Sequence, residues 1–113
     1  MSKSYKQINQ DQRTFGAAYR EQSPGTMNAF IELHKAAFTE GAVSTKYKEL
    51  IATGIAIAAR CDGCIAAHVQ AALKAGASKQ ELVETIDVAV LMGGGPSVIY
   101  GTQALQAIEE LAQ

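Results

Sequence analysis

Apolar residues recur along most of this chain at three- and four-residue intervals, the spacing that brings side chains to one face of a helix. One run places Met27, Phe30, Ile31, His34 and Phe38 on such a face. Strand-like alternation is nearly absent, and alanine, which favours helix, is abundant. The pattern predicts helices at about 5–20, 24–40, 45–59, 61–75, 79–92 and 96–112.

Turn and capping residues mark the ends of these helices. Pro24 and Pro96 suit the first turn of a helix, where a missing backbone N–H costs nothing. The segment Ser78–Glu81 is a capping box that opens the fifth helix. Gly41 and Gly76 stand where the second and fourth helices should stop. The signals agree with the periodicity and support an all-α chain.

The third predicted helix carries two small residues, Gly54 and Ala58, one turn apart on its apolar face. Small side chains at this spacing let another helix backbone approach closely without voids, and we expect such a contact here. The other interpretation is that Gly54 only weakens its helix, by about 1 kcal/mol relative to alanine.

A chain of 113 residues fits one domain, so we expect a single-domain bundle of about six helices. Residues 1–22 are polar and form an N-terminal helical arm in this interpretation, and residues 23–113 form the helical core. Apolar side chains of the last helix point in several directions: Val98, Ile99, Tyr100, Leu105, Ile108 and Leu111. Such excess apolar surface is commonly covered by a symmetric copy, and we therefore expect a homo-oligomer.

Composition narrows the class of partner. The formal net charge is −1, and no basic patch or tail is present, which argues against nucleic-acid binding. Residues 1–19 lack the apolar stretch of a signal peptide, and the longest apolar run, Leu50–Ala59, is too short to cross a bilayer. We expect a cytoplasmic protein with no membrane partner. In that compartment, two close cysteines are more often redox-active or metal-binding than a structural staple.

The chemistry of the chain is concentrated in Cys61-Asp62-Gly63-Cys64, which holds its only two cysteines, and in His68. On a helix, positions 61, 64 and 68 share one face. Cys61 should lie at a helix N-terminus, where unpaired N–H groups and the helix dipole favour a thiolate. A thiolate is the attacking species in peroxide reduction and disulfide exchange, a second thiol can complete a disulfide, and an imidazole can accept the thiol proton.

Two other interpretations of this cluster stay open. Cys61, Cys64 and His68 could be three zinc ligands, with His34, Glu49 or Asp62 as the fourth, although no second cysteine pair exists. The cysteines could also be inert core residues in a structural module. His34 taken alone, between apolar positions of its helix, is more simply a core or interface histidine.

These residues also carry a family resemblance across about residues 44–104. The matching segments are Lys48-Glu49-Leu50, the apolar run to Ala59, the Cys-x-x-Cys, His68, 72–77, Glu81, Glu84 and 92–96. A glutamate twelve residues before the first cysteine and a histidine four after the second are especially specific. The sequence thus resembles the alkylhydroperoxidase D-like branch of the carboxymuconolactone decarboxylase family.

The resemblance implies an all-helical antioxidant enzyme, a thiol-dependent peroxidase or disulfide reductase assembled as homotrimers or homohexamers. It implies that Cys64 is activated through a relay of Glu49 and His68, and that Cys61 is its disulfide partner and the more exposed thiol. The helix-dipole argument instead favours Cys61 as the more acidic thiol, so the order of attack stays open. Expected partners are a small hydroperoxide or disulfide substrate and a dithiol redox protein as electron donor, with no cofactor or bound metal.

The chain departs from the family at one relevant position, and its cysteine pair argues against one branch of the family. Gly63 stands where better-studied peroxidase members carry another histidine, which argues against high peroxidase activity. The decarboxylase branch lacks the cysteine pair, so lactone decarboxylation is a poor match. Glu49 also poses a geometric problem, because twelve residues of straight helix span about 18 Å. It reaches the cysteines only if the chain bends before Cys61 and the helices cross, or if another subunit supplies it.

Overall fold

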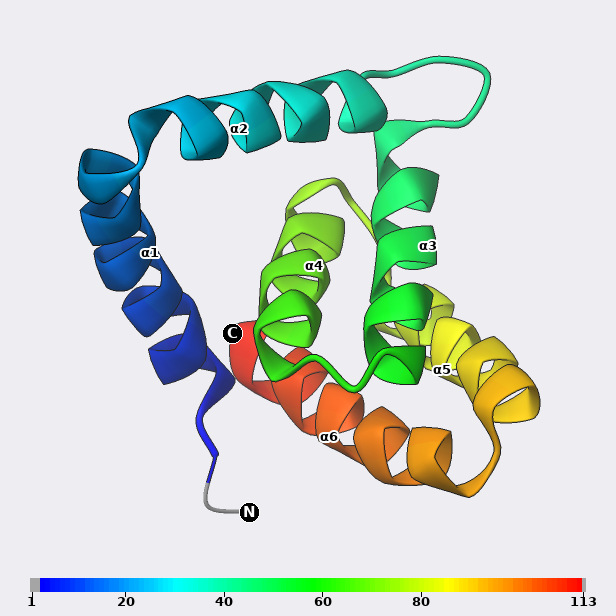
Figure 1. The fold of residues 1–113 in the computed structure, drawn as a ribbon. Coiled ribbons are helices and arrows are strands. Elements are labelled where there is room, and N and C mark those ends of the chain that lie inside the picture. The colour runs from blue at the N-terminus through cyan, green and yellow to red at the C-terminus, as the bar shows by residue number, and fades with distance from the viewer. Residues whose placement is uncertain (1–2, 113) are drawn as a thin grey trace.

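A computed structural model describes residues 3–112, and within this range the chain forms six α-helices and no strands, as predicted (Figure 1). None of the helices in this range is long and apolar enough to cross a membrane. Their bounds are α1 (Tyr5–Gln22), α2 (Pro24–Phe38), α3 (Thr45–Ala58), α4 (Asp62–Lys74), α5 (Lys79–Gly93) and α6 (Gly95–Leu111).

The capping residues act largely as the sequence indicates. The Ser44 side chain accepts from the Tyr47 N–H at the start of α3, and Ser78 and Glu81 form both bonds of the capping box of α5. Gly76 has a φ of 95°, the left-handed conformation that ends α4. Helix α2 stops before the expected Gly41, because the backbone turns extended at Thr39.

The core lies where α3, α4, α5 and α6 meet, and α4 lies between α1 and α3 (Figure 1). Its fully buried large side chains come from five helices: Tyr5, Ile57, Ile65, Val69, Leu82 and Ile108. Each such aliphatic side chain contributes about 1.5–3 kcal/mol when it leaves water. The core therefore fixes α4, which carries Cys64 and His68, on three sides.

The first half of α1 packs into this core. Tyr5 is fully buried, and buried Asn9 donates from Nδ2 to the Ala66 carbonyl of α4 at 3.0 Å. Beyond these residues α1 is mostly exposed, which is what a peripheral arm would show. The division into residues 1–22 and 23–113 as arm and core stays a prediction.

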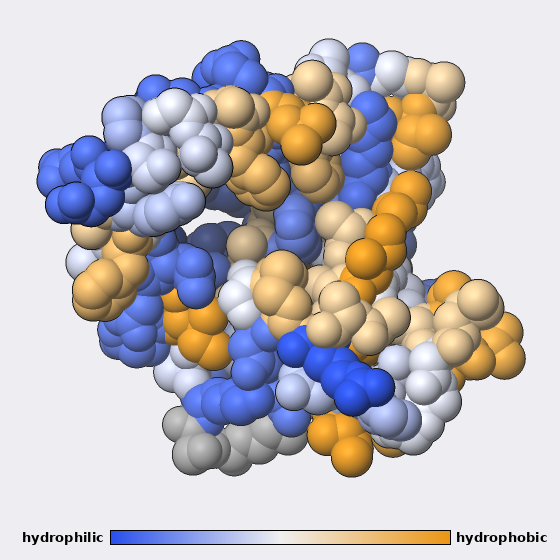
Figure 2. Space-filling model, viewed as in Figure 1, coloured by the Kyte–Doolittle hydropathy of each residue, from blue (hydrophilic) through white to orange (hydrophobic). Residues whose placement is uncertain are grey.

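Helix α2 is the least supported element. It has no buried residue, and Phe30, on the apolar face that the sequence indicates, is 59% exposed. In the space-filling view an opening separates the corner between α1 and α2 from α4 (Figure 2). The apolar face of α2 is therefore only partly covered in the single chain.

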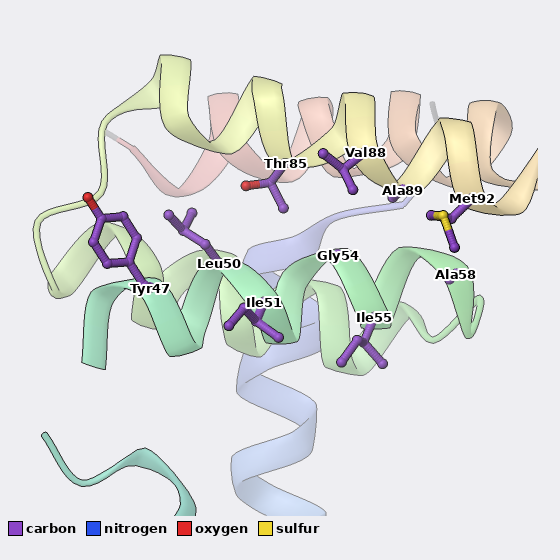
Figure 3. Close-up of a pocket in the computed structure, with 10 residues that line it drawn as sticks. All are labelled: Tyr47, Leu50, Ile51, Gly54, Ile55, Ala58, Thr85, Val88, Ala89 and Met92. Atoms are coloured by element: carbon purple, nitrogen blue, oxygen red, sulfur yellow. The ribbon is translucent and has the colours of Figure 1, made fainter. Parts of the chain in front are cut away.

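The close helix approach occurs at a different glycine from the one expected. A Cβ on Gly54 would meet Thr85 Cγ2 at an ordinary 3.5 Å, so Gly54 marks no tight crossing. Instead, Gly54 and Ala58 line an apolar groove of about 550 Å³ between α3 and α5 (Figure 3). The tight contact is at Gly101 of α6, where a Cβ would lie 2.8 Å from Ile86 Cγ2 of α5.

Candidate functional site

The turn between α3 and α4 brings the two halves of the site together. Arg60 takes a left-handed φ of 57°, and the Cys61 N–H donates back to the Ala56 carbonyl at 3.1 Å. The Arg60 N–H donates to the Ile57 carbonyl, so the pair of bonds forms a Schellman motif at the end of α3. The chain thereby reverses within a few residues and lets α4 pack along α3.

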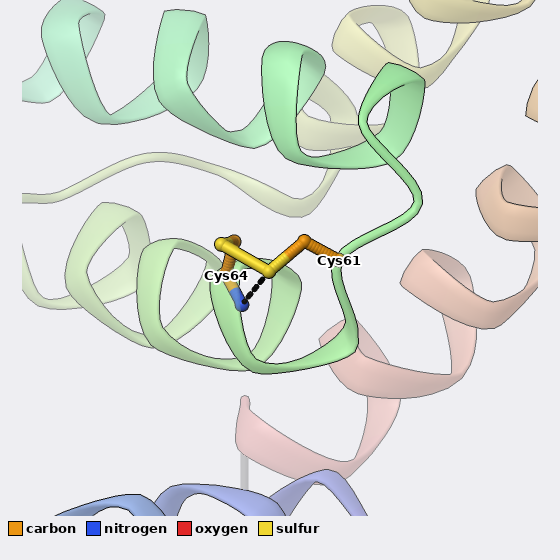
Figure 4. The surroundings of a disulfide bond; sticks show 2 residues. All are labelled: Cys61 and Cys64. Carbon is orange, nitrogen blue, oxygen red and sulfur yellow. Dashed lines mark hydrogen bonds between the residues drawn. A yellow bond between two sulfur atoms is a disulfide. The ribbon is translucent and has the colours of Figure 1, made fainter. Parts of the chain in front are cut away.

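Cys61 is the N-cap residue of α4 and forms a disulfide with Cys64 (Figure 4). Their Cα atoms are 5.2 Å apart, within the usual range for disulfides. Cys61 Sγ also accepts from the Cys64 N–H at 3.2 Å, the bond that an N-cap side chain makes. In the reduced protein the same N–H would stabilise a thiolate on Cys61.

The exposure of the two cysteines is the reverse of what the family resemblance implies. Cys64 is exposed, whereas Cys61 is only partly exposed. The expectation that Cys61 is the more exposed thiol is therefore wrong for this chain. The physical reason is the cap position, because Cys61 lies in the tight turn between two packed helices, while Cys64 lies one turn along α4 and lines a cavity.

The Glu49 carboxylate reaches the site directly. Its Oε1 lies 2.7 Å from His68 Nδ1, and Glu49 is only 5% exposed although it is ionisable. The bend at Arg60 and the packing of α3 on α4 supply the approach that a straight helix could not. An ionised carboxylate only accepts hydrogen bonds, so the Nδ1–H of His68 donates to Glu49. This leaves His68 Nε2 as the nitrogen that can exchange a proton with a thiol.

A cavity of about 330 Å³ lies beside Cys64 and His68, between α2, α3 and α4. Cys64 and His68 form part of its wall, together with His34. The remaining lining is apolar: Phe30, Leu33, Ala37, Phe38, Ala52, Ile55, Ala56 and Ala59. A small molecule in this cavity would meet one sulfur atom and two imidazoles within an otherwise hydrocarbon surface.

His34 is the site residue whose position the sequence alone did not indicate. Its ring stacks on Phe38 at a centroid distance of 4.6 Å and lies nearly parallel to the His68 ring, at 6.2 Å. The spacing of His34 and Phe38, one turn apart, does predict their contact. Only the folded chain shows that α2 places both rings beside α4.

The Asp62 carboxylate accepts hydrogen bonds from two residues near the start of the chain. Lys3 Nζ donates to its Oδ2 at 2.8 Å, and the Tyr5 hydroxyl donates to its Oδ1 at 3.1 Å. Burial and the neighbouring Asp62 carboxylate raise the pKa of Tyr5 well above its usual range. Within the described range, 3–112, no three His, Cys, Asp or Glu side chains lie close enough together to hold a metal ion. The zinc interpretation therefore gains no support from the geometry.

Comparison with known proteins points to one family. The model of the carboxymuconolactone decarboxylase family matches residues 24–107. An uncharacterized protein of Cupriavidus necator is 37% identical over 99 residues, which cover 88% of this chain and 87% of that protein. Uncharacterized protein 4 in the cox locus of Paracoccus denitrificans is 34% identical over 74% of this chain and 76% of its own length.

Solved structures agree with this assignment. A carboxymuconolactone decarboxylase family protein of Legionella pneumophila superimposes with a TM-score of 0.94 at 43% identity, over 96% of this chain and 97% of that one. A Thermotoga maritima member, for which a role in the antioxidative response has been suggested, has a TM-score of 0.83 at 27% identity. That match covers 93% of this chain and 89% of the other.

Proposed function

Because this chain belongs to the carboxymuconolactone decarboxylase family, we propose that it is an enzyme, a thiol-dependent oxidoreductase that reduces hydroperoxides or disulfides through Cys61 and Cys64. The observation that carries the proposal is the shared cavity wall of Cys64 and His68, with His68 fixed by buried Glu49. A redox role also fits the Cys61–Cys64 disulfide.

In this mechanism Cys64 attacks first. It lines the cavity, and His68 is the base on the same wall, whereas Cys61 lies in the turn behind it. His68 Nε2 takes the thiol proton, and Glu49 stabilises the resulting imidazolium through Nδ1–H. This assignment makes Glu49 a positioning residue, since it acts through His68.

The reduction of a hydroperoxide then follows in two steps. The Cys64 thiolate attacks the terminal peroxide oxygen, an S–O bond forms, and the O–O bond breaks. Sulfur is oxidised by two electrons to a sulfenic acid, and the peroxide is reduced to an alcohol whose oxygen takes up a proton. The Cys61 thiol attacks the sulfenic sulfur, water leaves, and the disulfide forms; an external dithiol, such as that of a redox protein, returns both cysteines to thiols.

The first prediction concerns Cys64→Ser. We expect this variant to lose turnover of both hydroperoxide and disulfide substrates by several orders of magnitude, because serine cannot form the disulfide that closes the cycle. Cys61→Ser should still consume one equivalent of hydroperoxide and accumulate a sulfenic acid on Cys64. Intact-protein mass spectrometry after peroxide titration distinguishes the two oxidation products.

The control is Ala67→Ser, which adds a hydroxyl to the exposed face of α4 and leaves the thiols and His68 in place. It should turn over like the unmodified protein. Full turnover by Cys64→Ser, or a wild-type protein whose reduced cysteines react with neither class of substrate, would remove the proposed function.

A further inference from the structure

The reaction above needs a proton donor that the Cys64, His68 and Glu49 set does not readily supply. When the O–O bond breaks, the leaving oxygen must be protonated, because an alkoxide or hydroxide is a poor leaving group at neutral pH. After His68 has taken the thiol proton, the Glu49 carboxylate, with its Oε1 2.7 Å from Nδ1, pairs with the imidazolium and favours its charged form.

The second imidazole of the cavity is placed to fill this role. His34 lines the cavity with Cys64 and His68 but belongs to α2, so it faces a bound molecule from a different side. Stacking on Phe38 holds its ring nearly parallel to that of His68, with an interplanar angle of 11°. His34 is exposed and can regain a proton from solvent after each turnover.

The surroundings of His34 single it out as the available acid. Among the described lining residues, only His34, Cys64 and His68 titrate, and every lining residue from α3 is apolar. On α2 itself, Glu32 and Lys35 pair with each other. Charged residues of α1 line a separate cavity against the first half of α2: Arg13, Arg20 and Glu21. From α3, Lys48 donates to the Thr39 carbonyl at 2.6 Å.

We propose that His34 is a catalytic residue, the general acid that protonates the oxygen leaving from a hydroperoxide attacked by Cys64. The proposal rests on the proposed function and adds a second imidazole to it. Imidazolium at His34 gives its proton to the leaving oxygen as the S–O bond forms, alcohol departs, and neutral His34 is reprotonated from water. Proton donation of this kind typically accelerates a reaction about 10²- to 10⁴-fold.

The second prediction therefore concerns His34→Gln in the reduced protein. We expect its rate constant for oxidation by cumene hydroperoxide to fall at least about tenfold near neutral pH. The pH profile of that rate should differ from the profile of the unmodified protein, because the substitution removes one imidazole from the cavity. The rate constant for alkylation of Cys64 by iodoacetamide should stay within about twofold of the value for the unmodified protein. Iodide leaves without a proton, so this reaction reports only the reactivity of the thiolate.

The control is Glu32→Gln, which removes a titratable group from the same helix but lies outside the cavity lining. It should match the unmodified protein in both reactions. A His34→Gln variant that keeps the peroxide rate and its pH profile overturns the role of His34 and leaves the proposed function intact. Equal losses in both reactions also overturn it, since they would show that His34 only supports the thiolate. A wild-type protein inert to hydroperoxide removes both proposals.

Discussion

At the residue scale, Tyr5 ties the first turn of α1 to the residue that follows Cys61. Its buried hydroxyl donates to Asp62 at 3.1 Å and lies 3.2 Å from the Gln103 amide oxygen of α6. An intramolecular hydrogen bond contributes about 0.5–1.5 kcal/mol net, so this hydroxyl stabilises the contact between the two helices. The contact also holds Asp62 in the first turn of α4, where a carboxylate suits the helix dipole.

The third prediction follows from the raised pKa of Tyr5. Because the folded state keeps its hydroxyl protonated, the stabilisation is fully present below the ordinary tyrosine pKa of about 10 and is lost as pH rises above it. Tyr5→Phe should lower the free energy of unfolding by about 1–2 kcal/mol at neutral pH. The difference from the unmodified protein should shrink above about pH 10.

Urea denaturation of both proteins at several pH values checks this prediction. Comparing the two proteins at each pH removes the contributions of groups that the substitution does not touch. Tyr19→Phe, on the exposed second half of α1, is the matched control and should change stability by less than about 0.5 kcal/mol at any pH. A gap between Tyr5→Phe and the unmodified protein that stays constant through the alkaline range would contradict the linkage.

The sequence could predict the chemistry of the site but not all of its contacts. Spacing on one helix places Cys61, Cys64 and His68 together, since that geometry is local. The Glu49 contact came from the family resemblance, because it depends on the turn at Arg60. His34 was assigned to a core or interface, because no local pattern reports which helices cross above α4.

At the element scale, α5 and α6 approach most closely at Gly101. The added methyl group of Gly101→Ala would lie 2.8 Å from Ile86 Cγ2, an atom on a branched and stiff side chain. The fourth prediction is a net loss of about 1–2 kcal/mol for this variant, because overpacking outweighs the gain in helix propensity.

Gly16→Ala is the matched control within α1. A Cβ there meets no atom within 4 Å, so only the helix propensity changes and stability should rise by up to about 1 kcal/mol. Denaturant midpoints at one protein concentration measure both variants. A Gly101→Ala variant as stable as Gly16→Ala would show that α6 can shift away from α5 at no cost.

The helices themselves were largely predictable, because periodicity and capping residues are local signals. The Ser78–Glu81 capping box predicted the start of α5 to the residue. The face that each helix buries was less predictable. The apolar stripe of α2 predicted core packing, yet no residue of α2 is buried. An apolar stripe indicates that a helix face is stabilised by burial, but it does not identify the element that buries it.

At the scale of the whole molecule, the single chain exposes more surface than its size requires. Its accessible area is 6820 Å², against roughly 5,900 Å² expected for a compact monomer of this mass. Apolar residues of the groove between α3 and α5 contribute, with Val88 62% and Met92 79% exposed (Figure 3). We propose that copies of this chain cover that surface in a homotrimer or homohexamer, as the family resemblance implies.

The fifth prediction is that Val88→Glu dissociates the oligomer to the 11.9 kDa single chain, because burying a carboxylate in an apolar interface is costly. Size-exclusion chromatography with light scattering measures the mass. Gln10→Glu adds the same charge on an exposed position of α1 and should leave the assembly unchanged. A Val88→Glu protein with the mass of the unmodified one, or an unmodified protein of single-chain mass, would exclude this groove as the interface.

The junction between α3 and α4 depends on the backbone torsion of Arg60. Arg60 is the one residue other than glycine with a positive φ in the described range, and it lies between the helix that carries Glu49 and the helix that carries His68. The chain reversal between these helices therefore passes through a residue that is not part of the Glu49–His68 hydrogen bond. A glycine at this hinge would widen the range of angles open to the junction. The reactivity of the cysteines could thus be tuned from a position that takes no part in the chemistry.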